Sequence, residues 1–163
     1  MVDTRLLHEA LSYLEVAVEN AKLARNDFMH LLGMLTLSYA YYLLDDKKHC
    51  LMYLRHFLRQ SKRVHVTVTV FPYFLELCWA MRQGKLAGMD RMEVDLQNDI
   101  EHMTRNRNVF MKGVAYRMKA LLQEQEGLHP SERIHSLNHS LNWLRESGQL
   151  VETARTMLVL ARN

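Results

Sequence analysis

The residues with the most obvious chemical potential are two histidines and a glutamate near the C-terminal end of the sequence. Glu132, His135 and His139 recur at i, i+3 and i+7, which places them on roughly one face of a helix expected over 131–147. Two histidines four residues apart can bind zinc if a third ligand arrives. The same pattern also fits the polar outer face of an amphipathic helix, and we prefer that interpretation. We therefore expect no metal site.

Carboxylates form the second group of candidates, because acid–base catalysis needs carboxylates or histidines that converge. Asp45 and Asp46 fall in an expected turn, while Asp95, Asp99 and Glu101 fit a charged helix face. No Gly-rich phosphate loop, G-x-S-x-G, H-E-x-x-H or C-x-x-C motif occurs in the sequence. We expect a protein that is not an enzyme and that uses no cofactor.

The composition favours a helical protein with a substantial core. The chain has 163 residues, is 48% hydrophobic and 24% charged, and contains only 6 Gly and 2 Pro. Most other residues are good helix formers. The formal charge of +3 is mild, and the basic run over 55–63 fits the polar face and C-terminal end of a helix. We therefore expect no direct binding to nucleic acid.

The sequence also indicates a compartment. Cys50 and Cys78 lie among apolar residues, which is typical of buried thiols in a reducing environment. The N-terminus already reads as an amphipathic helix and not as a signal peptide. No apolar run reaches the 18 or so residues that a membrane span needs. We expect a cytoplasmic protein without a membrane contact.

An internal repeat organises these elements. Amphipathic segments recur about every 41 residues, and each has a leucine at its second apolar position: Leu14, Leu54, Leu96 and Leu137. Between them, small residues recur in a second series: Ala40, Ala80, Ala120 and Ala161, with Gly33, Gly113 and Ala154 seven positions earlier. Asp45-Asp46, Gly84, Gly127 and Gly148 stand near expected helix ends, and Pro130 opens a helix.

The two series predict alternating helices of two kinds, B and A. The expected helices are B over 5–25, A over 28–45, B over 48–62, A over 64–83, B over 89–106, A over 109–126, B over 131–147 and A over 151–162. The stretch VHVTVTVFPYF (64–74) resembles a β-strand, but it occupies an A slot, so we expect a helix that bends near Pro72. The alternative is an extended 64–70 with the helix starting at Pro72.

The segment 37-LSYAYYLLDDKKHCLMYLRHFL-58 resembles a tetratricopeptide repeat. Leu37, small Ser38, Tyr41, small Cys50 and Leu54 follow the pattern of that family. The period of about 41 residues, against 34 in the standard repeat, and the large Phe57 at a small position depart from it.

The longer period is similar to the repeat domains of large bacterial regulators, including maltose-regulon-type activators. The ending 144-LRESGQLVETARTMLVLAR-162 resembles their repeat boundaries. The resemblance implies an all-α, right-handed superhelix of antiparallel helix pairs, and 1–163 as a single repeat domain. Because the array starts with an unpaired B helix and ends with an unpaired A helix, we expect it to be part of a longer protein or to form a homodimer through its terminal helices.

The resemblance implies a non-catalytic interaction or sensory module of a bacterial regulator. A helices line the concave groove in that family, so the phase of the alanine series predicts that a peptide or protein segment binds there. The expected groove residues are Leu35, Tyr39, Tyr42, Trp79, Arg82, Lys112 and Lys119. Aromatic and cationic side chains together suit an acidic or aromatic peptide. An equally weighted alternative is that Tyr39 and Trp79 pack in the core. The alternative is a sensor that encloses a small-molecule effector near Tyr42, Trp79 and Arg82 and controls transcription or another attached output domain.

Overall fold

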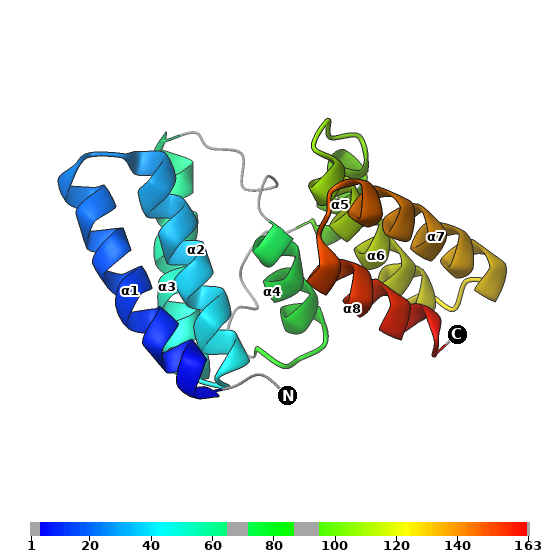
Figure 1. The fold of residues 1–163 in the computed structure, drawn as a ribbon, viewed down its shortest axis with the longest axis horizontal. Coiled ribbons are helices and arrows are strands. Elements are labelled where there is room, and N and C mark those ends of the chain that lie inside the picture. Colours follow the sequence, from blue (N-terminus) through cyan, green and yellow to red (C-terminus); the bar gives the residue numbers. More distant parts are fainter. Residues whose placement is uncertain (1–3, 65–71, 87–94, 163) are drawn as a thin grey trace. The chain divides into compact units, whose positions relative to one another are not determined.

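The computed structural model describes residues 4–64, 72–86 and 95–162. The regular structure in these ranges is entirely α-helical, which confirms the all-α prediction (Figure 1). The helices are α1 (Thr4–Leu23), α2 (Asp27–Leu43), α3 (Lys47–Val64), α4 (Pro72–Arg82), α5 (Leu96–Thr104), α6 (Val109–Gln125), α7 (Pro130–Glu146) and α8 (Leu150–Leu160). None of the described helices is long and apolar enough to cross a membrane.

The chain divides into two compact units. The first unit comprises residues 1–68 and 80–92, and the second comprises residues 69–79 and 93–163. Helix α4 is therefore shared: its residues up to Trp79 belong to the second unit and its last residues to the first.

In the first unit, α2 packs against both α1 and α3 (Figure 1). The turn before α2 is made by Arg25, which has a φ of 52°, and by Asn26, whose side chain accepts a hydrogen bond from the Met29 amide at 3.1 Å. Close packing is possible because Gly33 has no side chain: a Cβ there would lie 2.5 Å from Val18 Cγ2 on α1. The short turn and the glycine contact place α1 close against α2.

In the second unit, α6 packs against α5 and α7, and α7 packs against α8. Asn108 caps α6 by accepting hydrogen bonds from the Phe110 and Met111 amides. Gly127 and Gly148, both with a φ of 71°, follow α6 and α7 as expected for helix C-termini. Gly113 on α6 lies against Leu144 on α7, where an added Cβ would lie 2.5 Å from Leu144 Cγ.

Most predicted helix boundaries agree with the structure to within two residues, but two differ. The helix expected over 89–106 begins at Leu96, because Asp95 is its N-cap and accepts a hydrogen bond from the Asn98 amide at 3.1 Å. Residues 89–94 lie outside the described ranges. The described part of the helix expected over 64–83 is α4, Pro72–Arg82, so the choice between a helix bent near Pro72 and an extended 64–70 falls largely outside the described ranges. Val64 is the last residue of α3, and residues 65–71 lie outside the described ranges.

The two cysteines are free thiols buried in helices, as predicted. Cys50 is fully buried and Cys78 is 3% exposed. Burial raises the pKa of both thiols, because a thiolate loses hydration in an apolar environment. Both side chains therefore behave as small apolar residues and not as nucleophiles.

Candidate functional site

The residues predicted to line a groove occupy several different environments. Leu35 and Tyr39 are buried in α2, so they contribute to packing. Tyr42 is half-buried, and its ring centroid lies 6.1 Å from that of Tyr39. On α4, Trp79 is half-buried and Arg82 is exposed.

The two lysines of the predicted set lie on α6 and are half-buried. Lys112 Nζ stands 4.4 Å above the ring of Trp143 on α7, a cation–π contact. Lys119 lies two turns further along α6. The first unit has an open groove between α1, α2 and α3. None of the seven predicted residues lines it.

That groove has a volume of about 1080 Å³, is open to solvent, and is formed by α1, α2, α3 and the turn between α1 and α2. It is lined by Glu15, Val18, Glu19, Lys22, Arg25, Asp27, His30, Met34, Leu37, Tyr53, His56, Arg59, Gln60 and Arg63. We call it the basic groove, because four Lys or Arg side chains and two His side chains face three Asp or Glu side chains. The α2 face involved is not the face that carries Leu35, Tyr39 and Tyr42.

The two sides of the basic groove differ in charge. The α1 side mixes signs, and its Lys22 pairs with Glu19 at 3.7 Å across one helical turn. The α3 side carries only cationic or neutral residues, and the sequence of α3, KKHCLMYLRHFLRQSKRV, contains no Asp or Glu. Arg59 and Arg63 are both exposed there. A ligand that lies along α3 would therefore meet positive charge with no acidic side chain on that helix, while Glu15, Glu19 and Asp27 line the rest of the groove.

A cluster of polar aromatic contacts ties α1, α2 and α3 together. Tyr41 on α2 donates a hydrogen bond to Glu15 Oε1 on α1 at 2.8 Å, and its ring stacks on Tyr53 of α3 with centroids 5.6 Å apart. Burial, together with the hydrogen bond to Glu15, raises the pKa of Tyr41 to about 12. Glu15 and Tyr53 also line the basic groove, so this cluster fixes one part of its wall.

The carboxylates considered as acid–base candidates have local structural roles. Asp46 accepts hydrogen bonds from the His49 amide at 3.1 Å and from its ring Nδ1 at 2.6 Å, which lowers the pKa of Asp46. Asp95 caps α5. Desolvation raises the pKa of the half-buried Asp99, and Glu101 is exposed. These residues are spread over helix starts and outer faces.

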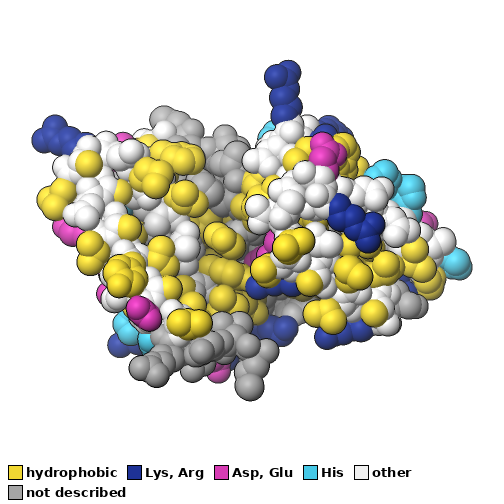
Figure 2. All heavy atoms as spheres, viewed as in Figure 1, with side chains coloured by type: hydrophobic (Ala, Val, Ile, Leu, Met, Phe, Trp, Pro, Cys, Tyr) yellow, Lys and Arg dark blue, Asp and Glu magenta, His cyan; other side chains and the backbone are white. Residues whose placement is uncertain are grey.

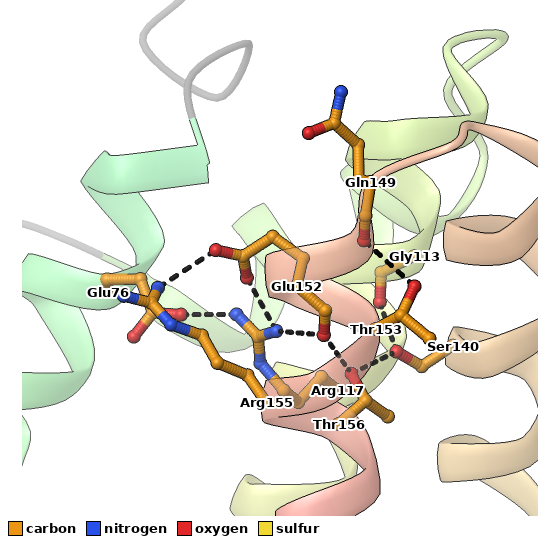
Figure 3. A network of polar contacts seen from close by, with 9 residues as sticks. All are labelled: Glu76, Gly113, Arg117, Ser140, Gln149, Glu152, Thr153, Arg155 and Thr156. Atoms are coloured by element: carbon orange, nitrogen blue, oxygen red, sulfur yellow. Dashed lines mark hydrogen bonds and ion pairs between the residues drawn. The ribbon is translucent and has the colours of Figure 1, made fainter.

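The second unit contains a buried charge network that the sequence did not reveal (Figure 3). Arg117 on α6 is 3% exposed and lies between two carboxylates. Its guanidinium pairs with Glu76 of α4 and, at 2.6 Å, with Glu152 of α8. Arg155 approaches Glu152 from the outer side at 2.9 Å. Because the guanidinium is permanently charged and both acids pair with it, the network holds three helices together and offers no free acid or base.

Neighbouring hydroxyls extend this network. The Ser140 hydroxyl on α7 donates to the Gly113 carbonyl oxygen of α6 at 2.7 Å and lies 3.1 Å from Thr156 Oγ1 of α8. Thr156 in turn donates to the Glu152 carbonyl oxygen at 3.0 Å. A lone Arg on the apolar face of 109–122 was the one sequence signal that could have indicated a buried ion pair.

Comparison of the chain with protein families, curated proteins and solved structures finds no match. Within the described ranges, no three His, Cys, Asp or Glu side chains are placed together as metal ligands. We take the basic groove of the first unit as the candidate binding site because of its open shape and its charged lining.

Proposed function

We propose that the protein is a non-catalytic interaction module that binds an acidic segment of a partner protein in the basic groove. The observation that carries the proposal is an open groove of about 1080 Å³ whose α3 wall is basic and free of carboxylates. Small-molecule pockets are typically about 300–1,000 Å³ and enclose most of the ligand. An open groove with a volume just above that range suits an extended chain segment better.

The chemistry of the groove supports an acidic segment that also carries apolar side chains. Arg59 and Arg63 can each pair with a carboxylate in two parallel hydrogen bonds, the geometry that the planar guanidinium favours. Val18 on α1 and Tyr53 on α3, both half-buried, add apolar lining between the charged walls. Charge would orient the segment, while burial of its apolar residues against Val18 and Tyr53 would supply the remaining affinity.

The repeat pattern supports a wider role as the partner-binding part of a regulator. The resemblance to tetratricopeptide-like arrays of bacterial regulators favours a cytoplasmic protein whose helix pairs continue as a right-handed superhelix. In such a protein, occupancy of the groove would alter contacts with an output domain. The alternative, a small-molecule sensor at Tyr42, Trp79 and Arg82, stays a prediction that the basic groove does not test, because those side chains do not line it.

We extend the proposal to self-association through the terminal helices. Leu150 and Leu158 on α8 are 81% and 61% exposed, and Tyr13 and Leu23 on α1 are 70% and 73% exposed. Hydrophobic side chains are visible at the surface over both helices (Figure 2). Since α1 is a B helix and α8 an A helix, a second copy would continue the A–B alternation. Light scattering should then show mass rising with concentration, and Leu158→Lys should keep the chain monomeric.

The groove proposal is tested by charge reversal on α3. We expect an acidic peptide with interspersed Leu and Phe to bind the protein in a fluorescence-anisotropy titration, with an affinity that falls as salt is raised. Arg59→Glu and Arg63→Glu should each weaken binding by about tenfold or more, since each replaces an attraction by a repulsion. Lys48→Glu is the matched control, because Lys48 is exposed on the same helix but outside the groove.

Equal losses in all three variants would show that the peptide senses only the net charge of the chain. No loss in Arg59→Glu or Arg63→Glu would exclude the basic groove as the binding site.

A further inference from the structure

The outer face of α7 brings two imidazole rings into direct contact. His135 and His139 are separated by one helical turn, and their Nε2 atoms lie 3.1 Å apart. The ring centroids are 4.5 Å apart with an interplanar angle of 81°. The His139 ring also stacks on Tyr116 of α6, with centroids 5.0 Å apart. Tyr116 therefore restrains one ring of the pair while the other faces solvent.

In place of the sequence-based expectation of no metal site, we propose that His135 and His139 form a surface site that chelates a divalent transition-metal ion of the imidazole-preferring class, such as zinc. Metal–imidazole bonds are about 2.0–2.1 Å long, so two nitrogens 3.1 Å apart would subtend about 100° at a shared ion. That angle lies between the octahedral and tetrahedral values. The separation observed between the two Nε2 atoms is thus the separation that one bound ion requires.

The protein need not rearrange its backbone to bind the ion. In the metal-free chain, one ring must donate an N–H to the lone pair of the other, because two facing lone pairs would repel. When the donor ring carries its proton on Nδ1 in place of Nε2, by exchange with solvent and with no net proton loss, both Nε2 lone pairs are free and a metal ion accepts them. The rings can turn toward it by rotation about χ2, a torsion with a broad energy minimum.

The site differs from a structural zinc centre in that the chain supplies only two ligands. Within the described ranges no third His, Cys, Asp or Glu completes a metal-binding group with this pair. Water, or a side chain from a partner, would occupy the remaining positions. Imidazole ligands suit zinc, copper and nickel and not the oxygen-preferring calcium or magnesium, so the site should discriminate between these groups of ions.

Calorimetric titration of the full chain with zinc chloride, in a buffer that does not bind metal, tests the proposal. We expect one ion per chain at this site, no heat with magnesium, and a loss of affinity of at least about tenfold in His135→Gln or His139→Gln. His102→Gln is the control, because His102 is exposed on α5 and has no histidine one turn away. Both substituted positions lie at the surface side of α7, and circular dichroism would verify that each variant is folded.

A second variant keeps the number of histidines on α7 constant and changes only their spacing; we call it the register variant. His139→Asn combined with Asn142→His keeps two imidazoles on α7 but moves them two turns apart, about 10 Å along the axis. We expect this variant to bind zinc as weakly as His139→Gln. Wild-type affinity in the register variant or in either single variant, or no zinc binding by the wild-type chain, would overturn the proposal.

Discussion

Arginines in the two units meet opposite surroundings. In the first unit, Arg59 and Arg63 are exposed on a helix without carboxylates, and they line an open groove. In the second unit, Arg117 is 3% exposed and lies between Glu76 and Glu152. A buried guanidinium whose charge is matched by two acids contributes to the packing of three helices. Exposed guanidinia without matching acids on their helix remain available to an incoming anion. The comparison separates residues that hold the fold from residues that can bind.

The glycines of the two units give a second comparison. Gly33 and Gly113 occupy the same phase of the repeat, yet Gly33 meets the preceding helix α1 and Gly113 meets the following helix α7. The neighbour of Gly33 is the tip of the Val18 side chain, whereas Gly113 lies against both the side chain and the backbone of Leu144. The same sequence signal therefore serves two different contacts.

The largest effect should follow from removing the buried cation. Arg117→Met would leave Glu76 and Glu152 without their partner, and breaking a buried pair in this way costs about 3–5 kcal/mol. Because both glutamates keep some exposure, 21% and 14% of their side chains, we expect about 3 kcal/mol, measured by urea unfolding. Arg155→Met, at the outer side of the same network, should cost under about 1 kcal/mol. Similar losses in both variants would remove the distinction between buried and exposed arginines.

Alanine substitutions at Gly113 and Gly33 should change the free energy of unfolding by smaller amounts that differ between the two units. A methyl group at Gly113 would lie 2.5 and 2.7 Å from two Leu144 side-chain atoms and 3.1 Å from its amide nitrogen. We expect Gly113→Ala to lower the free energy of unfolding by about 1–3 kcal/mol through overpacking. Gly33→Ala should be closer to neutral, because Val18 is only half-buried and can shift, and because Ala favours the helix by about 1 kcal/mol.

Thermal and urea unfolding of the two glycine variants would test this order. A larger loss in Gly33→Ala than in Gly113→Ala would contradict this order. It would show that the α1–α2 contact at Gly33 tolerates an added methyl group less well than the α6–α7 contact at Gly113.

The smallest effect concerns the Tyr41 cluster of the first unit. The pKa of Tyr41 is raised to about 12, while a tyrosine in an unfolded chain has a pKa of about 10. The stabilisation is therefore fully present below pH 10 and is lost as the pH rises toward 12, because only the unfolded chain releases the proton in between. Burial also raises the pKa of Tyr53, so alkaline titration of the tyrosine absorbance should show late-titrating groups whose number falls by one in Tyr41→Phe. An unchanged titration curve in that variant would show that Tyr41 is not the protected residue.

Much of the helical pattern could be predicted because local signals define it. The helix expected over 109–126 is found over Val109–Gln125, since Asn108 caps its start and Gly127 follows its end. The start of α5 was predicted too early. The apolar spacing over 91–105 fits one amphipathic helix, but Asp95 within that segment caps the helix, which begins at Leu96. Sequence periodicity indicates which face of a helix is apolar. It does not indicate which of several polar residues caps the start of that helix.

The site could be predicted less well than the fold. The alanine phase selected the face of α2 that carries Leu35 and Tyr39, and both are buried. The basic groove lies on the face with His30, Met34 and Leu37, whose role depends on the placement of α1 and α3. The partners of Arg117 lie 41 and 35 positions away in the sequence. Such contacts are set by tertiary packing, which one sequence does not reveal.

Amide chemical-shift mapping with the acidic peptide tests the central claim most directly. If the basic groove binds the peptide, the shifts that change most should belong to His30, Met34, Tyr53, Arg59 and Arg63, while amides of α7 should stay unchanged. Perturbations confined to the second unit, or centred on Trp79, Lys112 and Lys119, would contradict the account and assign binding to another surface.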